Sequence, residues 1–160
     1  MDRVDTCLIA IRRILRATEL YSRELKLVAG VTAVQFRVLQ IIGERGHATA
    51  KEISVQMRVS QATVTSLVDK LVRQNLAVRE KSETDRRQIN IHITAAGRQT
   101  LAEAPDPLQQ RFVRKFGAME DWEQAMLVSS LERVAAMLDA DDLDASPVLD
   151  TGDIKNVLDH

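Results

Sequence analysis

A change in the spacing of apolar residues near position 76 constrains the fold more than any other feature of this chain. Before it, the apolar side chains of residues 64–72 recur with the 3.6-residue period of an amphipathic helix. After it, residues 88–93 alternate polar and apolar, as a half-buried strand does. Residues 76–78 can pair with that strand across the charged segment 81–87, which suits an exposed hairpin tip. The sequence therefore predicts a helix followed directly by a β-hairpin.

A second short helix is expected immediately before that helix. Thr49 and Glu52 have the spacing of a capping box, in which a hydroxyl and a carboxylate satisfy each other's backbone N–H groups. This helix reaches Met57, and Ser60 caps the following one. The turn between them is the three residues 58–60, which is the spacing of a helix-turn-helix. The hairpin that follows the second helix then has the position of a wing.

Two further helices are predicted ahead of the helix-turn-helix. Residues 3–28 carry apolar side chains at helical spacing. Thr32 and Gln35 form another capping box, and the helix that they begin is apolar on two sides, as a core helix is. We expect Gly43 and Gly46 to end it.

Helices are also predicted after the hairpin. Thr94 caps one that Pro105 and Pro107 interrupt, because proline cannot donate a backbone hydrogen bond, and that resumes to Phe116. A last helix covers residues 122–138. The predicted order is α-α-α-α-β-β-α-α, a mainly α fold with a small β-hairpin wing.

The first and last helices have more apolar surface than a small winged core can cover, which indicates a partner chain. We therefore expect a homodimer, with residues 1–30 and 98–142 as the helical dimerisation region and residues 31–97 as the winged helix-turn-helix core. Residues 143–160 form an acidic tail, either disordered or partly folded against the body. The expected interface residues are Leu8, Ile11, Leu15, Phe112, Phe116, Trp122, Leu131 and Leu138.

The net charge of −1 conceals an uneven distribution. Residues 51–98 hold nine Lys and Arg against five Asp and Glu, a balance of +4. Residues 118–160 hold two Lys and Arg against eleven Asp and Glu, a balance of −9. A basic middle can face phosphates while the acidic end faces away, and the acidic end also has the composition of a solubilising tail.

The helix that begins after Ser60 presents a face suited to the bases of DNA. Residues 60–68 carry no charge, whereas a solvated helix face usually carries several. Its glutamine can bond an adenine edge, its threonine methyls can touch thymine, and its N-terminal amides can hold a phosphate. The candidate recognition residues are Ser60, Gln61, Ala62, Thr63, Thr65, Ser66 and Lys70.

Basic side chains on and near the hairpin are candidates for the DNA backbone and the minor groove. Arg86 or Arg87 at the tip can enter a minor groove, whose negative potential attracts a guanidinium. Asp85 is repelled by phosphate, and we expect it to hold a neighbouring arginine in place. The remaining candidates are non-specific phosphate contacts, namely Lys51, Arg58, Arg73, Arg79 and Lys81.

Three segments of the chain resemble the MarR family (multiple antibiotic resistance regulators). Residues 31–39 are similar to that family's second helix, and residues 60–72 to its recognition helix. The Thr-Asp-Arg-Arg run at 84–87, followed by Ile-His-Ile-Thr-Ala-Ala-Gly at 91–97, resembles its wing and fifth helix. The resemblance covers roughly residues 5–140. It implies a dimer that binds a palindromic operator on double-stranded DNA, usually as a repressor released by a small ligand or an oxidant.

Two kinds of trigger stay open at this stage. In the resembled family a ligand crevice lies where the dimer helices meet the winged core, and the arginine expected there can pair with an anionic or aromatic effector. The oxidant-sensing branch of the family has its reactive cysteine near the position of Cys7, but Ala33 stands where an aromatic is expected. A lone helical cysteine also serves as a small apolar filler. The candidate crevice residues are Arg16, Tyr21, Phe36 and Met57.

Other classes of function find no support in the sequence. The three histidines are scattered without ligand spacing, so neither a metal nor a cofactor is expected, and no catalytic arrangement is recognisable. With one cysteine, no intramolecular disulfide can form, and no run of 18 apolar residues exists, so we expect a cytoplasmic protein without a membrane. The competing hypothesis is a winged-helix module used only for protein assembly.

Overall fold

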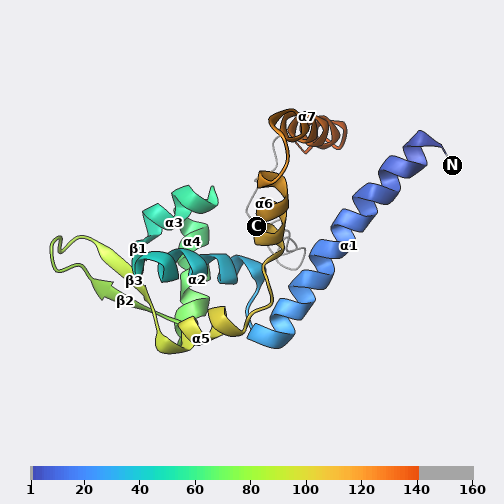
Figure 1. Cartoon of the computed structure of the whole chain (residues 1–160). Coiled ribbons are helices and arrows are strands. Elements are labelled where there is room, and N and C mark those ends of the chain that lie inside the picture. Colours follow the sequence, from blue (N-terminus) through green and yellow to red (C-terminus); the bar gives the residue numbers. More distant parts are fainter. Residues whose placement is uncertain (1, 141–160) are drawn as a thin grey trace. The chain divides into compact units, whose positions relative to one another are not determined.

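A computed structural model describes residues 2–140 of the protein (Figure 1). Within this range, residues 2–105 form one compact unit and residues 106–140 a second. The acidic tail predicted at 143–160 lies outside the described residues. The elements are α1 (Arg3–Ala29), α2 (Ala33–Arg45), β1 (His47–Thr49), α3 (Ala50–Met57), α4 (Gln61–Arg73), β2 (Ala77–Lys81), β3 (Ile89–Ile93), α5 (Ala95–Glu103), α6 (Leu108–Gly117) and α7 (Asp121–Met137).

The predicted helix starts are confirmed in atomic detail. Thr32 accepts the backbone N–H of Gln35, and the Gln35 side chain accepts the N–H of Thr32 at 2.9 Å. Thr49 and Glu52 make the same reciprocal pair at the start of α3. Each box satisfies two backbone donors that the first turn of a helix leaves open, which is why both helices begin where the spacing predicts.

The ends of the helices are less well predicted. Gly30 closes α1 in the left-handed conformation, with φ at 71°, as expected of a C-terminal glycine. Gly46 ends α2, but Gly43 lies inside that helix, so the expectation that both glycines end it was wrong. The segment around Pro105 and Pro107 separates two helices, α5 and α6, so three helices follow the hairpin rather than two.

The sheet has three antiparallel strands in the order β1-β3-β2, one more than predicted. The additional strand, β1, pairs Ala48 with Ile91 and connects α2 to α3. The hairpin strands pair from Ala77 opposite Ile93 out to Lys81 opposite Ile89. From Asn90 to His92, β3 therefore pairs with both β1 and β2. Between Asn90 and the hairpin tip, it pairs only with β2.

One face of this sheet and the inner faces of the helices form the core of the first unit. α2 is buried on two sides, as its pattern predicts, and α3 and α4 contribute Ile53, Met57 and Val64 among others. The sheet contributes Ala48, Ala77, Ile91 and Ile93. Because the fold is mainly helical with a small sheet, it agrees with the predicted fold class.

The second unit consists of α6 and α7. The Gln124 side chain donates to the backbone carbonyls of Phe116 and Met119, at 3.1 Å each, and so joins the two helices. Arg114 pairs with Asp106 just ahead of α6. Large apolar side chains of this unit stay exposed, with Trp122 at 66% and Met137 at 74%.

No single helix between residues 2 and 140 has the length and hydropathy needed to cross a membrane. The helices α1 and α2 reach that length and hydropathy only when they are taken together as one segment with a 64° bend, and α2 is a core helix.

Candidate DNA-binding surface

Helix α4 separates its apolar and polar residues cleanly. Val64, Leu67, Val68 and Leu71 are buried against the rest of the first unit. The candidate recognition side chains Gln61, Ala62, Thr63, Thr65, Ser66 and Lys70 are exposed, as is the N-cap Ser60. The structure thus places the uncharged part of α4 at the surface of the first unit.

The start of α4 is ordered by its own hydroxyl groups. Ser60 Oγ accepts the backbone N–H of Thr63 at 3.1 Å and lies 2.9 Å from the Thr63 hydroxyl. Thr65 donates its hydroxyl proton to the carbonyl of Gln61. These bonds restrict the side-chain rotamers of both threonines, so the positions of their methyl groups are set before any partner binds.

The hairpin tip is a built turn rather than a loose loop. Ser82 is buried, and its Oγ accepts the backbone N–H groups of Thr84 and Asp85, each at 3.3 Å. The Ser82 N–H donates to the carbonyl of Gln88 at 2.9 Å, which closes the tip. Sequence reasoning did not identify Ser82, although a serine that begins a polar hairpin tip is a typical turn residue.

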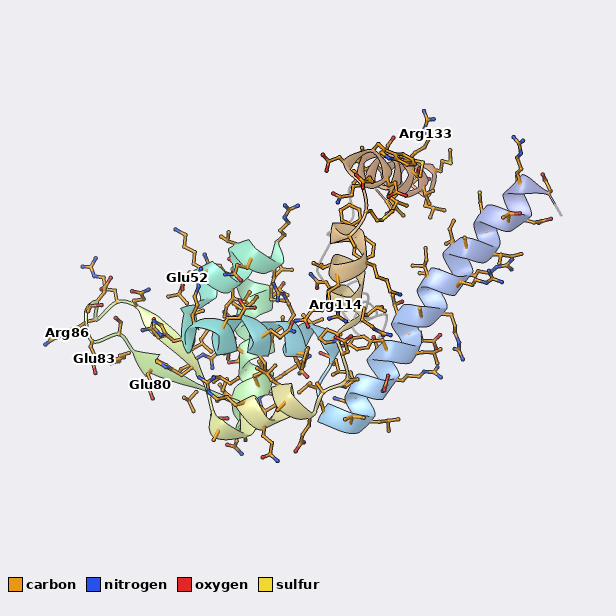
Figure 2. The ribbon with its side chains drawn as sticks, in the orientation of Figure 1. Glu52, Glu80, Glu83, Arg86, Arg114 and Arg133 are labelled. Atoms are coloured by element: carbon orange, nitrogen blue, oxygen red, sulfur yellow. The ribbon has the colours of Figure 1, made fainter. Side chains whose placement is uncertain are left out.

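Asp85 shapes the backbone of the tip. Its carboxylate accepts the backbone N–H of Arg87 at 3.0 Å, so its contact is with the Arg87 main chain and not with a guanidinium. Figure 2 shows Arg86 at the far end of the hairpin, directed away from the helices. Within the described residues, no acceptor binds the guanidinium of Arg86 or of Arg87. The tip therefore presents two available cations on an ordered turn.

All five predicted phosphate contacts are exposed, namely Lys51, Arg58, Arg73, Arg79 and Lys81. Arg79 differs from the other four in its partners. Its guanidinium forms an ion pair with Asp69 of α4 at 2.6 Å and donates to the carbonyl of Thr65 at 3.4 Å. Sequence reasoning missed Asp69, because nothing local in the sequence pairs a helix carboxylate with a strand arginine ten residues later.

Comparison with known proteins identifies the family. The MarR family model matches residues 29–88, from the end of α1 to the hairpin tip. The helix-turn-helix transcriptional regulator YpoP of Bacillus subtilis strain 168 is 31% identical over 100 residues, which are 62% of this chain and 71% of YpoP. The chain belongs to the MarR family. It is thus a DNA-binding transcriptional regulator and not an enzyme.

Solved structures agree with the winged-helix fold of this MarR-family regulator. A crystal structure of a MepR-like protein complexed with pseudoligands aligns with a TM-score of 0.59 and 24% identity, over 86% of this chain and 97% of that one. The regulator MosR of Mycobacterium tuberculosis, crystallised in complex with DNA, aligns with a TM-score of 0.54 and 23% identity, over 82% and 96%.

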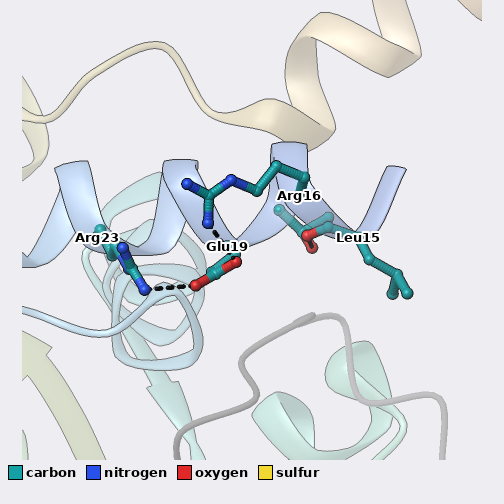
Figure 3. A network of polar contacts seen from close by, with 5 residues as sticks. Leu15, Arg16, Glu19 and Arg23 are labelled. Carbon is teal, nitrogen blue, oxygen red and sulfur yellow. Dashed lines mark hydrogen bonds and ion pairs between the residues drawn. The ribbon is translucent and has the colours of Figure 1, made fainter. Parts of the chain in front are cut away.

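The predicted crevice residues of the MarR-family regulator do not share one environment. Tyr21, Phe36 and Met57 are buried in the core of the first unit. Arg16 is exposed on α1, and its guanidinium pairs with the carboxylate of Glu19 at 2.9 Å. Figure 3 shows that Glu19 also forms an ion pair with Arg23, so this carboxylate lies between two arginines. An anionic ligand at Arg16 would have to compete with Glu19.

The remaining predicted residues of the regulator are exposed or half-buried in the single chain. Cys7 lies exposed near the start of α1. In α1, Leu8 is 46% exposed and Leu15 is 53% exposed, while Ile11 is half-buried. In the second unit Phe116 is half-buried, and the exposed members of the predicted interface are Phe112, Trp122, Leu131 and Leu138.

One carboxylate in the first helix of the helix-turn-helix has a shifted pKa. The backbone N–H of Thr49 donates to Glu52 and lowers the pKa of that carboxyl below its usual 4.5, and Arg45 and His47 add to the effect. Glu52 therefore remains charged at the start of α3, where negative charge also favours the helix dipole.

Proposed function

We propose that this MarR-family regulator binds a palindromic operator on double-stranded DNA as a homodimer and represses the genes beside it. One observation carries the proposal: the exposed, uncharged start of α4 belongs to the same unit as an ordered hairpin tip with two available arginines. Short polar groups suit base edges in a major groove, and guanidinium groups suit a minor groove. The remaining exposed cations would add sequence-independent affinity.

Exposed apolar surface supports the homodimer. Val4, Leu8 and Leu15 are each about half exposed or more on α1, as are Trp122 and Leu131 on α7. Monomeric proteins rarely leave so many large apolar side chains in water on long helices. A symmetric pair of chains would present two copies of α4, and a palindromic operator is the DNA counterpart of that symmetry.

Relief of repression by a small effector is the proposed means of regulation. The pseudoligand complex of the MepR-like protein supports a small-molecule effector, and the family resemblance supports an anionic or aromatic one. Arg16 is the proposed cation for an anionic effector. Such a ligand would act by binding one arrangement of the two α4 helices better than the other.

The test is a gel-shift series with duplexes from the regulator's own promoter region and with random-sequence duplex, at several salt concentrations. The proposal predicts a steep fall of affinity with salt and a retained preference for one palindrome. Sedimentation equilibrium of the same preparation should give a dimer. No binding at low salt would instead favour a module that only assembles proteins.

A further inference from the structure

Arg79 connects strand β2 to helix α4 through its side chain. Side chains alternate between the two faces of a strand, so Arg79 lies on the same face of β2 as the buried Ala77. Its partner in register is Ile91, which is also buried. Arg79 therefore starts from the core side of the sheet, at the place where the hairpin leaves the core, but the residue is exposed, and a third of its side-chain surface stays in contact with water.

The partner of Arg79 is the recognition helix itself. Arg79 Nη2 lies 2.6 Å from Asp69 Oδ1, and the same nitrogen donates to the Thr65 carbonyl at 3.4 Å. Asp69 and Thr65 are four residues apart on α4, so the guanidinium contacts two successive turns of that helix. Two contacts from one planar group restrict rotation of the hairpin about α4 more than a single contact could.

The outer half of the hairpin has little other support. β1 pairs with β3 only from Asn90 to His92, so the part of the hairpin between Asn90 and the tip has no third strand beside it. The two side chains of the ion pair are 33% and 42% exposed, and such pairs add little to global stability. The ion pair is therefore better suited to setting an angle between two elements than to holding the fold together.

We infer that the Asp69–Arg79 ion pair holds the wing at a fixed angle to α4, so that the helix and the tip can contact one duplex at the same time. Arg79 is then a positioning residue and not a phosphate contact. The inference rests on the proposed function, since the angle matters only to a partner that touches both elements.

The first test compares Asp69→Asn, Arg79→Gln and the double variant on two probes: the duplex that the wild type selects from a random pool, and unselected random duplex. Each single variant should lose about tenfold in affinity for the selected duplex, with no further loss in the double variant, since both break one interaction. Affinity for random duplex and the salt slope should not change. The charge-reversed pair, Asp69→Arg with Arg79→Asp, should recover part of the loss.

A phosphate contact by Arg79 predicts the opposite sign for one variant. Asp69→Asn would then strengthen binding, because it removes a negative charge and frees the guanidinium, and Arg79→Gln would reduce the salt slope by about 0.9. Either result would overturn the inference. Asp106→Asn is the matched control, because it removes an Asp–Arg ion pair from the second unit. It should leave affinity unchanged.

The second test needs no DNA and separates this inference from the proposed function. Spin labels on Gln61→Cys in α4 and Glu83→Cys at the tip, in a Cys7→Ser background diluted with unlabelled protein, report the distance between helix and wing. The distance distribution should be narrow with the ion pair intact and should broaden with Arg79→Gln. An unchanged distribution would refute the inference even if DNA binding is demonstrated, and a wild type that selects no duplex would refute only the proposed function.

Discussion

Replacing Gly97 in α5 by alanine should destabilise the winged unit more than the same replacement of Gly43 in α2. Gly97 is buried in the first turn of α5, where its N–H donates to the Thr94 hydroxyl at 3.0 Å. A Cβ at this position would lie 2.3 Å from the Leu76 carbonyl oxygen and 2.7 Å from Ile93 Cγ1. The carbonyl cannot move away freely, because it accepts the N–H of Thr94 at 3.1 Å.

The expected cost follows from these contacts. Overpacking that moves backbone costs about 1–3 kcal/mol. A strained or lost backbone hydrogen bond adds about 1 kcal/mol. Alanine recovers about 0.5–1 kcal/mol through its better helix propensity. The net destabilisation is about 2 kcal/mol, which for a chain of this size lowers Tm by about 4–8 °C.

Gly43→Ala is the matched control. Its Cβ would lie 2.9 Å from Leu101 Cδ1, the end of a flexible side chain that can turn aside. The helix-propensity gain should offset that adjustment, so Gly43→Ala should stay within about 1 kcal/mol of wild type.

The assay is urea unfolding followed by far-UV circular dichroism, with all proteins at one concentration because the stability of a dimer depends on it. Fluorescence of Trp122, the single tryptophan, follows the second unit separately. A Gly97→Ala midpoint equal to that of Gly43→Ala would contradict this prediction, since it would show that α5 can move away from the Leu76 carbonyl without cost.

Four further predictions concern the surface. Arg86→Ala should weaken binding to the selected duplex by about 1.5 kcal/mol without changing Tm, and unaltered affinity in gel shifts would remove the wing tip from the mechanism. Thr49→Ala should cost about 1 kcal/mol through the lost cap. The pKa of Glu52 is lowered in the folded state, so the stabilisation that its carboxylate adds is complete above the usual carboxyl pKa and is lost as pH falls through the folded value. Glu52→Gln keeps a hydrogen-bond acceptor, and its urea midpoint should fall less than that of the wild type between pH 7 and pH 4. An equal fall would contradict this assignment. Peroxide should affect DNA binding equally in the wild type and in Cys7→Ser, and a loss confined to the wild type would assign oxidant sensing to the thiol.

Local chemistry made much of the fold predictable. The hydroxyl caps at Thr32, Thr49, Ser60 and Thr94 each begin a helix in the structure, because a cap satisfies backbone donors within three residues of itself. The hairpin was visible for the same reason, since alternation over residues 88–93 is also a local signal.

Features that depend on distant contacts were not predictable in this way. β1 has three residues, too few to show alternation, and exists because it pairs with β3 some forty residues later. Gly43 reads as a helix end, yet packing against α5 keeps it inside α2. The Asp69–Arg79 ion pair depends on how the hairpin folds back along α4, which no spacing encodes.

Selection from a random-sequence duplex pool will show whether two copies of α4 and its wing read one duplex together. The selected duplexes should contain an inverted repeat whose half-site centres are about 10 base pairs apart, one helical turn of DNA. Recovery of a lone half-site, or of no preferred sequence at low salt, would contradict it.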